Sequence, residues 1–336
     1  MKYLVVLVAI ALIGCSKREK ELTFKVGSKV IFGDSIDTGG GMLGDIGFFA
    51  INNNQEVYII DKAYKTIKMY SAEGKMIREY GKGEGVGPGE LYNPDGIDVD
   101  QNNNVYVMDS QIRRVTIFDN EGSVRNIINS PFMAANIVAT QPGVFYLTGL
   151  PLSYTGDLIY KYDINDKQNN DKPVFKFCER YDPGENIAWA NNGARIGLEK
   201  DNNGNIYYNF PYPYEIRIFN PDGVLLNKYS RNIKNFKPPY YKTVNGVKIN
   251  ISDNVLLDPV FVTDEIIAYR VVQDELEKQY LDFYNLRTKK YIGTINSAEL
   301  GVDKSFQIKG DKKGHIYYAL TRPYPHVVKM ELSIKE

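Results

Sequence analysis

The stretch Val99-Asp100-Gln101-Asn102-Asn103-Asn104-Val105-Tyr106-Val107 carries the pattern that decides the fold. An apolar residue ends one strand, a run of Asp and Asn turns the chain, and Val-Tyr-Val begins a second strand. Asp and Asn favour turns because their short side chains hydrogen-bond to nearby backbone groups, whereas Val and Tyr favour strands. The stretch therefore predicts two strands joined by a tight turn.

The same pattern recurs along the chain, in residues 50–59, 139–147, 199–207, 262–269 and 309–317. The aligned second-strand positions lie between 40 and 61 residues apart. Most copies continue with a third strand that ends in an Asn-, Asp- or Glu-Gly turn, and then a fourth strand. Six such units are typical of the blades of a β-propeller, whereas two separate β-sandwiches would show no common register between copies.

We therefore predict an all-β, six-bladed β-propeller with four-stranded blades over residues 22–336. The last unit lacks a fourth strand, and residues 22–32 contain a spare strand. An N-terminal strand that completes the last blade would close the ring and remove an exposed sheet edge. The expected blades span roughly residues 45–80, 95–129, 135–178, 193–231, 258–296 and 304–334.

The first residues predict export and a lipid anchor. The apolar run 3–13 has 11 residues, too few for a membrane-spanning helix but typical of a signal peptide. It ends in Leu12-Ile13-Gly14-Cys15, which resembles the bacterial lipobox, where the Cys is acylated and the chain is cut before it. We expect a signal peptide over 1–14, a lipidated Cys15 and a tether over 15–21; a plain secretory signal is the alternative.

Charge and cysteine content limit which ligands and which covalent partners the chain can have. The chain has 41 Lys and Arg against 41 Asp and Glu, so its net charge of zero argues against nucleic-acid binding. With Cys15 lipidated, Cys178 has no disulfide partner, and its strand-like surroundings predict a packed thiol. We expect a monomer in the cell envelope, on the periplasmic or the outer side of the outer membrane, that contacts the membrane only through its lipid.

A family resemblance follows from residues 81–97, the glycine-rich segment GKGEGVGPGELYNPDGI. This segment resembles the lead-in of an NHL-type repeat, and 105–109 and 114–119 resemble its body. Together with the lipobox, the chain resembles the six-bladed propeller lipoproteins of Gram-negative gut bacteria. The resemblance implies the fold but no single activity, because NHL relatives include binding scaffolds, receptor ectodomains and a few lyases.

The sequence lacks the residues that several kinds of enzymatic site require. Only His315 and His326 are present, so a three-histidine zinc site such as that of the NHL-type amidating lyase cannot form. The sequence also lacks the G-x-S-x-G motif that positions a nucleophilic serine for a Ser/His/Asp triad. The glycines of 81–89 are followed by Pro94 and a strand, not by the helix that a phosphate loop requires. A Ca²⁺-dependent hydrolase that resembles the lactonase-type propellers, with Glu, Asn and Asp in the channel, is the alternative function; otherwise we expect no cofactor.

Topology separates two faces. We call the face with the turns between strands one and two, and three and four, the turn face. The loop face carries the loops between strands two and three and the links between blades, which vary more and are rich in aromatics and Arg. Variable loops on a rigid scaffold often bind ligands, so we predict a binding module for a saccharide, a peptide or a protein on the loop face. The predicted ligand-binding residues are Asp95, Asp109, Arg113, Trp189, Asn191, Arg195, Tyr212, Tyr214, Arg322, Tyr324 and His326.

Overall fold

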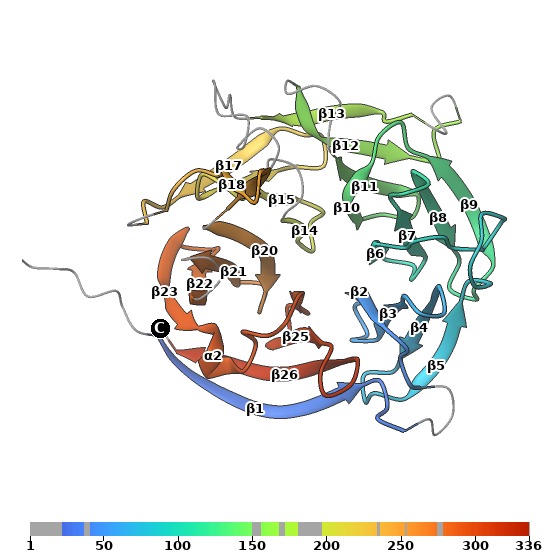
Figure 1. Cartoon of the computed structure of the whole chain (residues 1–336), viewed down its shortest axis with the longest axis horizontal. Coiled ribbons are helices and arrows are strands. Elements are labelled where there is room, and N and C mark those ends of the chain that lie inside the picture. The colour runs from blue at the N-terminus through green and yellow to red at the C-terminus, as the bar shows by residue number, and fades with distance from the viewer. Residues whose placement is uncertain are drawn as a thin grey trace, which may run out of the picture.

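The computed structural model describes residues 22–36, 41–149, 156–167, 172–180, 197–233, 236–252, 254–273 and 278–335. Within these ranges, six four-stranded antiparallel sheets stand around a central channel, which confirms the predicted six-bladed propeller (Figure 1). The one helix in these ranges is the single turn α2 (Ser297–Leu300). No helix of the described chain is long and apolar enough to cross a membrane.

The blades follow one another along the chain, and each runs from an inner strand at the channel to an outer strand at the rim. The strands of blades one to three are β2 (Ile46–Ile51), β3 (Val57–Asp61), β4 (Thr66–Tyr70), β5 (Met76–Tyr80), β6 (Gly96–Val99), β7 (Val105–Asp109), β8 (Arg114–Phe118), β9 (Val124–Asn129), β10 (Ala134–Ala139), β11 (Val144–Gly149), β12 (Asp157–Asp163) and β13 (Phe175–Glu179). Those of blades four to six are β14 (Leu198–Lys200), β15 (Ile206–Asn209), β16 (Glu215–Phe219), β17 (Leu225–Ser230), β20 (Val255–Phe261), β21 (Ile266–Gln273), β22 (Lys278–Asn285), β23 (Lys290–Asn296), β24 (Ile308–Gly310), β25 (His315–Leu320) and β26 (His326–Lys335), with β1 (Thr23–Phe32) outermost.

The ring closes through β1, as predicted. β1 pairs antiparallel with β26, from Thr23 opposite Lys335 to Phe32 opposite Val327, and wraps around the outside of blade six (Figure 1). Phe32 is fully buried, and its ring lies 6.0 Å from that of Tyr317 and 6.3 Å from that of Tyr70. The N-terminal strand therefore joins blade six to blade one through both its hydrogen bonds and its apolar side chain.

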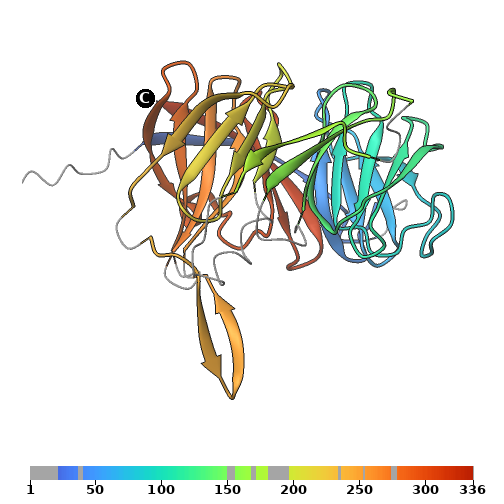
Figure 2. The same ribbon diagram turned by 90° about the horizontal axis from the view of Figure 1, so that it is seen from above.

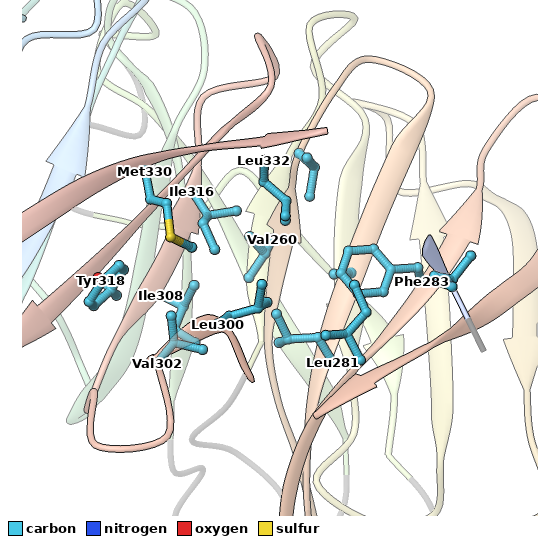
Figure 3. Packing of buried hydrophobic residues seen from close by; sticks show 14 of the residues in the cluster. Val260, Leu281, Phe283, Leu300, Val302, Ile308, Ile316, Tyr318, Met330 and Leu332 are labelled. Carbon is cyan, nitrogen blue, oxygen red and sulfur yellow. The ribbon is translucent and has the colours of Figure 1, made fainter. Parts of the chain in front are cut away.

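Apolar packing between neighbouring blades forms the core. Among the described residues, each of six hydrophobic clusters takes its side chains from two adjacent blades. Figure 3 shows the cluster between blades five and six, in which Val260 and Phe283 pack toward Ile316 and Met330. Because each blade is buried on both faces, its middle strands read as continuous apolar runs; all five residues of β3 and of β7 are buried.

A two-stranded hairpin that the sequence analysis did not predict interrupts the link between blades four and five. It consists of β18 (Tyr240–Val244) and β19 (Val247–Ile251) and projects away from the ring (Figure 2). Side chains directly opposite one another in an antiparallel pair share a side, so the exposed Val244 and Val247 lie on one face of the hairpin. The hairpin belongs to the loop face, since it lies in an inter-blade link.

We expect Phe32→Ala to destabilise the protein by about 3–5 kcal/mol, because it leaves a cavity in the cluster that joins blade six to blade one. Chemical or thermal denaturation measures the loss. The matched control is Ile31→Ala on the same strand, where the side chain is 50% exposed and the cost should stay within about 0.5 kcal/mol. Equal effects of the two substitutions would show that β1 does not close the ring.

Candidate functional site

A polar cavity lies at the turn-face end of the central channel. Its volume is about 340 Å³, and side chains from all six blades line it. The lining is mostly polar, and the turns between the first and second strand of the blades contribute most of it. The repeated turn that decides the fold therefore also builds the mouth of the channel.

One hydrogen-bonding pattern shapes these turns. In blade two, Oδ1 of Asp100 accepts the backbone N–H groups of Asn102 (2.8 Å) and Asn104 (3.0 Å). Its Oδ2 accepts Nδ2 of Asn104 (2.7 Å) and the hydroxyl of Tyr106 (3.0 Å). An Asp that accepts the N–H groups two and four residues on closes a tight turn. The carboxylate and the buried tyrosine six residues later thus hold the turn together.

Three other blades repeat the pattern with small changes. Asp201 accepts the N–H groups of Asn203 and Asn205, each at 2.9 Å. Asp311 accepts those of Lys313 (2.8 Å) and His315 (3.2 Å), and the hydroxyl of Tyr317 donates to its Oδ2. Asn52 takes the same place in blade one, where its Oδ1 accepts the N–H groups of Asn54 and Glu56. The first residue of each turn is therefore structural.

In four blades the second residue of the turn faces the cavity instead. Asn53, Gln101, Asn202 and Lys312 all occupy this position, and all line the cavity. In blade five the equivalent residue is Asp264, which accepts a 2.6 Å hydrogen bond from Nδ2 of Asn202. These residues vary from blade to blade, which is the pattern expected of positions that contact a ligand on a repeated scaffold.

Two ion pairs lie deeper in the channel. Nζ of Lys200 lies 2.7 Å from Oδ2 of Asp98 and also donates to the carbonyl of Val99. Nζ of Lys309 lies 2.8 Å from Oε2 of Glu199. Burial by itself would raise the pKa of Glu199, but the nearby Lys309 and Lys200 outweigh it and lower that pKa. Asp98 and Glu199 therefore each have a lysine ammonium as counter-ion.

The loop-face end of the channel is much narrower. A cavity of about 30 Å³ lies there, lined by Asp95, Asp258 and Gln307 and, like the larger cavity, by Glu199 and Lys309. Burial raises the pKa of Asp258, against the opposing effect of Arg270 and Lys309. The pair Glu199–Lys309 thus separates the wide end of the channel from the narrow one.

Three of the predicted ligand-binding residues are buried in structural contacts on the loop side. Tyr214 is 2% exposed, donates to Oδ2 of Asp282 (3.0 Å) and accepts from the hydroxyl of Tyr284 (2.9 Å), so a ligand in solvent cannot stack on its ring. Asp109 is 1% exposed and accepts two backbone N–H groups of the preceding link. His326 is 5% exposed, and its Nδ1 contacts the carbonyl of Tyr324.

The other predicted residues are more accessible but do not form one site. Arg113 and Arg322 are exposed and Tyr324 is half-buried. Tyr212 is half-buried and stacks on Phe236, with ring centroids 5.7 Å apart. The loops of blades four and six are separated by blade five (Figure 1).

The remaining predictions fall in two groups. Asp95 accepts the backbone N–H of Ser110 at 3.0 Å and lines the narrow end of the channel. Trp189, Asn191, Arg195 and Cys15 lie outside the described residues.

The cavity lining was missed by the sequence analysis because the Asn-rich stretches were assigned to turn formation alone. Asp100, Asp201 and Asp311 do have that role. A signal was nevertheless present in the residue after each of them, which changes between amide and lysine while its neighbours repeat. Cys178 is 4% exposed, and burial raises the pKa of its thiol to about 12, which fits a packed side chain.

The carboxylates that line the wide end of the channel already have partners within the protein. Ca²⁺ takes six to eight oxygen ligands. Asp98 and Glu199 each bind a lysine ammonium, while Asp100, Asp201 and Asp311 bind the N–H groups of their own turns. Among the described residues, no group of three or more His, Cys, Asp or Glu is placed to hold a metal ion. The carboxylates at the wide end of the channel are therefore engaged within the protein, and the Ca²⁺-dependent hydrolase stays an alternative prediction.

Six four-stranded blades around a polar channel mouth define a six-bladed propeller with a cavity on its turn face. The chain belongs to the DUF5128 family, described as a 6-bladed beta-propeller, whose model matches residues 42–320. No curated protein matches the chain.

Solved structures share this fold at low sequence identity. A Bacteroides fragilis protein named as exported has a TM-score of 0.63 and 12% identity, over 93% of this chain and 96% of its own. A member of the DUF4221 family from Bacteroides vulgatus has a TM-score of 0.62 and 10% identity, over 95% and 100% of the two chains. The aldose sugar dehydrogenase of Streptomyces coelicolor has a TM-score of 0.54 and 12% identity, over 94% and 99%.

We expect Tyr106→Phe to destabilise the protein by about 1–3 kcal/mol. The hydroxyl of Tyr106 donates to Asp100 and accepts the backbone N–H of Gly143 in blade three at 2.8 Å, so its loss leaves the buried N–H of Gly143 without this acceptor and removes one donor to Asp100. Equilibrium denaturation measures the change. Tyr64→Phe, at a side chain that is 54% exposed, is the matched control and should change stability by less than about 0.5 kcal/mol. If the two variants were equally stable, the turn would not depend on this hydroxyl.

Proposed function

We propose that this protein is a lipid-anchored, extracytoplasmic binding module that takes a polar ligand into the cavity at the turn-face end of its channel. The observation that carries the proposal is the cavity itself, about 340 Å³ and lined from all six blades. Ligand pockets commonly have volumes of about 300–1,000 Å³ and a few convergent polar groups. The amides of Asn53, Gln101 and Asn202 can both donate and accept hydrogen bonds, which suits a saccharide or a peptide.

Two observations support an extracytoplasmic location. The N-terminal sequence has a signal-peptide pattern that ends in Leu12-Ile13-Gly14-Cys15, which resembles a lipobox. A solved structure with the same fold is of a protein named as exported. We include in this proposal that residues 81–97 are the lead-in of an NHL-type repeat.

The closing strand relates the anchor to the cavity. β26 begins at the loop face and ends at Lys335 on the turn face, and Thr23 lies opposite Lys335. The chain therefore enters the propeller at the turn face. A lipid on Cys15 would be connected to this face by a tether of at most about 25 Å, at about 3.5 Å per residue. The cavity would then face the membrane at short range, which favours a small or slender ligand over a bulky partner.

The loop face is a second candidate surface, for a protein partner. The hairpin β18–β19 projects from this face and exposes Val244, Val247 and Ile249 (Figure 2). A lone two-stranded hairpin is only marginally stable in water, so a partner that covers its apolar side would stabilise it. Arg113, Arg322, Tyr212 and Tyr324 lie in loops of other blades on the same face.

A glycan and peptide binding screen on the chain from Ser16 onward tests the location of the site. For any ligand found, Gln101→Trp should weaken binding at least tenfold, about 1.4 kcal/mol, because the indole fills the mouth of the channel. Arg322→Ala, an exposed change on the loop face, should leave the affinity within about twofold. The opposite ranking would move the site to the loop face, where the sequence analysis predicted it.

The anchor has its own test. We expect Cys15→Ala to abolish lipidation, so that the protein accumulates as an unprocessed precursor or is found in the soluble fraction. Membrane fractionation and the mass of the mature N-terminus measure both outcomes. Ser16→Ala, which leaves the cysteine in place, is the control and should remain membrane-bound. An identical distribution of the Cys15→Ala variant and the parent protein would contradict lipid anchoring.

A further inference from the structure

Lys312 differs from the other residues that occupy the second position of a turn and line the channel mouth. Its counterparts Asn53, Gln101 and Asn202 are neutral amides, whereas Lys312 carries a positive charge. It lies in the turn between β24 and β25 and is half-buried. Of the second-position residues that line the cavity, Lys312 is thus the one that carries a charge.

The ammonium group of Lys312 is partly desolvated but has no counter-ion. Among the described residues, none forms an ion pair or hydrogen bond with it; its Nζ lies 5.3 Å from the centre of the Phe261 ring. Burial lowers the pKa of Lys312, and this effect exceeds the opposing one of Glu199. A cation in such a place is stabilised when an anion enters and pairs with it.

The nearby carboxylates are already engaged. Glu199 pairs with Lys309, and Asp98 pairs with Lys200. Asp201 and Asp311 accept the N–H groups of their own turns. Glu199 and Asp98 are therefore balanced by other lysines, and Asp201 and Asp311 are held in their own turns, so none of these carboxylates forms an ion pair with Lys312.

The backbone fixes Lys312 in this place. Its φ of 65° lies in the left-handed region, which a lysine seldom adopts, and its N–H donates to the carbonyl of Phe261 at 3.1 Å. None of the other second-position residues that line the cavity, Asn53, Gln101 and Asn202, has a positive φ. Left-handed non-glycine residues are concentrated at functional sites, where the surrounding structure maintains the strain.

We propose that Lys312 binds the carboxylate of an acidic saccharide, while the amides of Asn53 and Gln101 hydrogen-bond to its hydroxyl groups. This inference rests on the proposed function and specifies the ligand class of the same cavity. A saccharide fits better than an apolar ligand because the cavity is lined by amides, charged groups and turn backbone, with Phe261 as the one aromatic side chain among the lining residues. An acidic saccharide fits better than a neutral one because of the unpaired ammonium group.

Calorimetric titration with two matched probes tests the inference. Tetragalacturonate carries carboxylates, and its fully methyl-esterified form has the same sugar rings without the charge. The chain from Ser16 onward, which keeps every described residue, should bind the acid at least tenfold more tightly than the ester. Rising salt should reduce that preference, since the contact is between opposite charges.

Variants of Lys312 and of the neighbouring Lys313 test whether the preference for the acid depends on Lys312. Lys312→Met should remove the preference for the acid, and Lys312→Asn should do the same with a residue that tolerates the left-handed backbone. Lys313→Met is the matched control: Lys313 is the adjacent, exposed lysine, and the variant should keep at least half of the preference. Melting temperatures within a few degrees of the parent exclude unfolding as the cause.

Each outcome decides one point. Loss of the preference in both Lys312 variants but not in Lys313→Met supports the inference. Equal binding of acid and ester, weakened alike by Gln101→Trp, would overturn the role of Lys312 and leave the cavity as the binding site. Binding of neither probe would overturn the acidic-saccharide assignment, whereas the separate screen decides whether the cavity binds any ligand.

Discussion

The hydrogen bond between the first side chain of a blade turn and the tyrosine hydroxyl six residues later is the interaction on which the structure depends. In blade two, Asp100 holds both its own turn and the hydroxyl of Tyr106, while that hydroxyl accepts the N–H of Gly143 in the next blade. A single buried group thereby fixes the turn, the start of the second strand and the contact between blades. Since unpaired buried polar groups are costly, few other residues can replace the pair.

This hydrogen bond makes the first position of a turn structural, whereas the position after it can vary. The first residue of the turn faces inward to its own backbone, so the second is directed to the channel mouth, where Asn53, Gln101 and Lys312 lie. The scaffold can thus change the chemistry of the cavity one blade at a time without changing the turn. A repeated fold gains a specific site in this way, because the repeats supply the position and the variable residues supply the ligand contacts.

Charge pairing within the channel joins different blades of the propeller. Asp98 and Glu199 face Lys200 and Lys309 at 2.7 Å and 2.8 Å, so their charges are balanced within the protein. These ion pairs join inner strands of different blades. Asp98 lies on β6 of blade two and Lys200 on β14 of blade four, and β10 of blade three lies between these two strands. Within the described part of the chain, the ammonium of Lys312 takes part in no such pair, and the inferred ligand follows from that.

The sequence alone was sufficient for the repeat, the number of blades and the closing strand, because turn chemistry and strand alternation are local and occur six times. It could not determine which face holds the cavity. Aromatic and Arg-rich loops suggested the loop face, yet Tyr214 and His326 are buried there, since an amphipathic ring packs between blades as readily as it binds a ligand. The hairpin β18–β19 and the pairing of Lys309 with Glu199, 110 residues apart, were equally beyond reach. Only closure of the ring brings such distant side chains together, and that closure determines which polar groups are paired and which remain available.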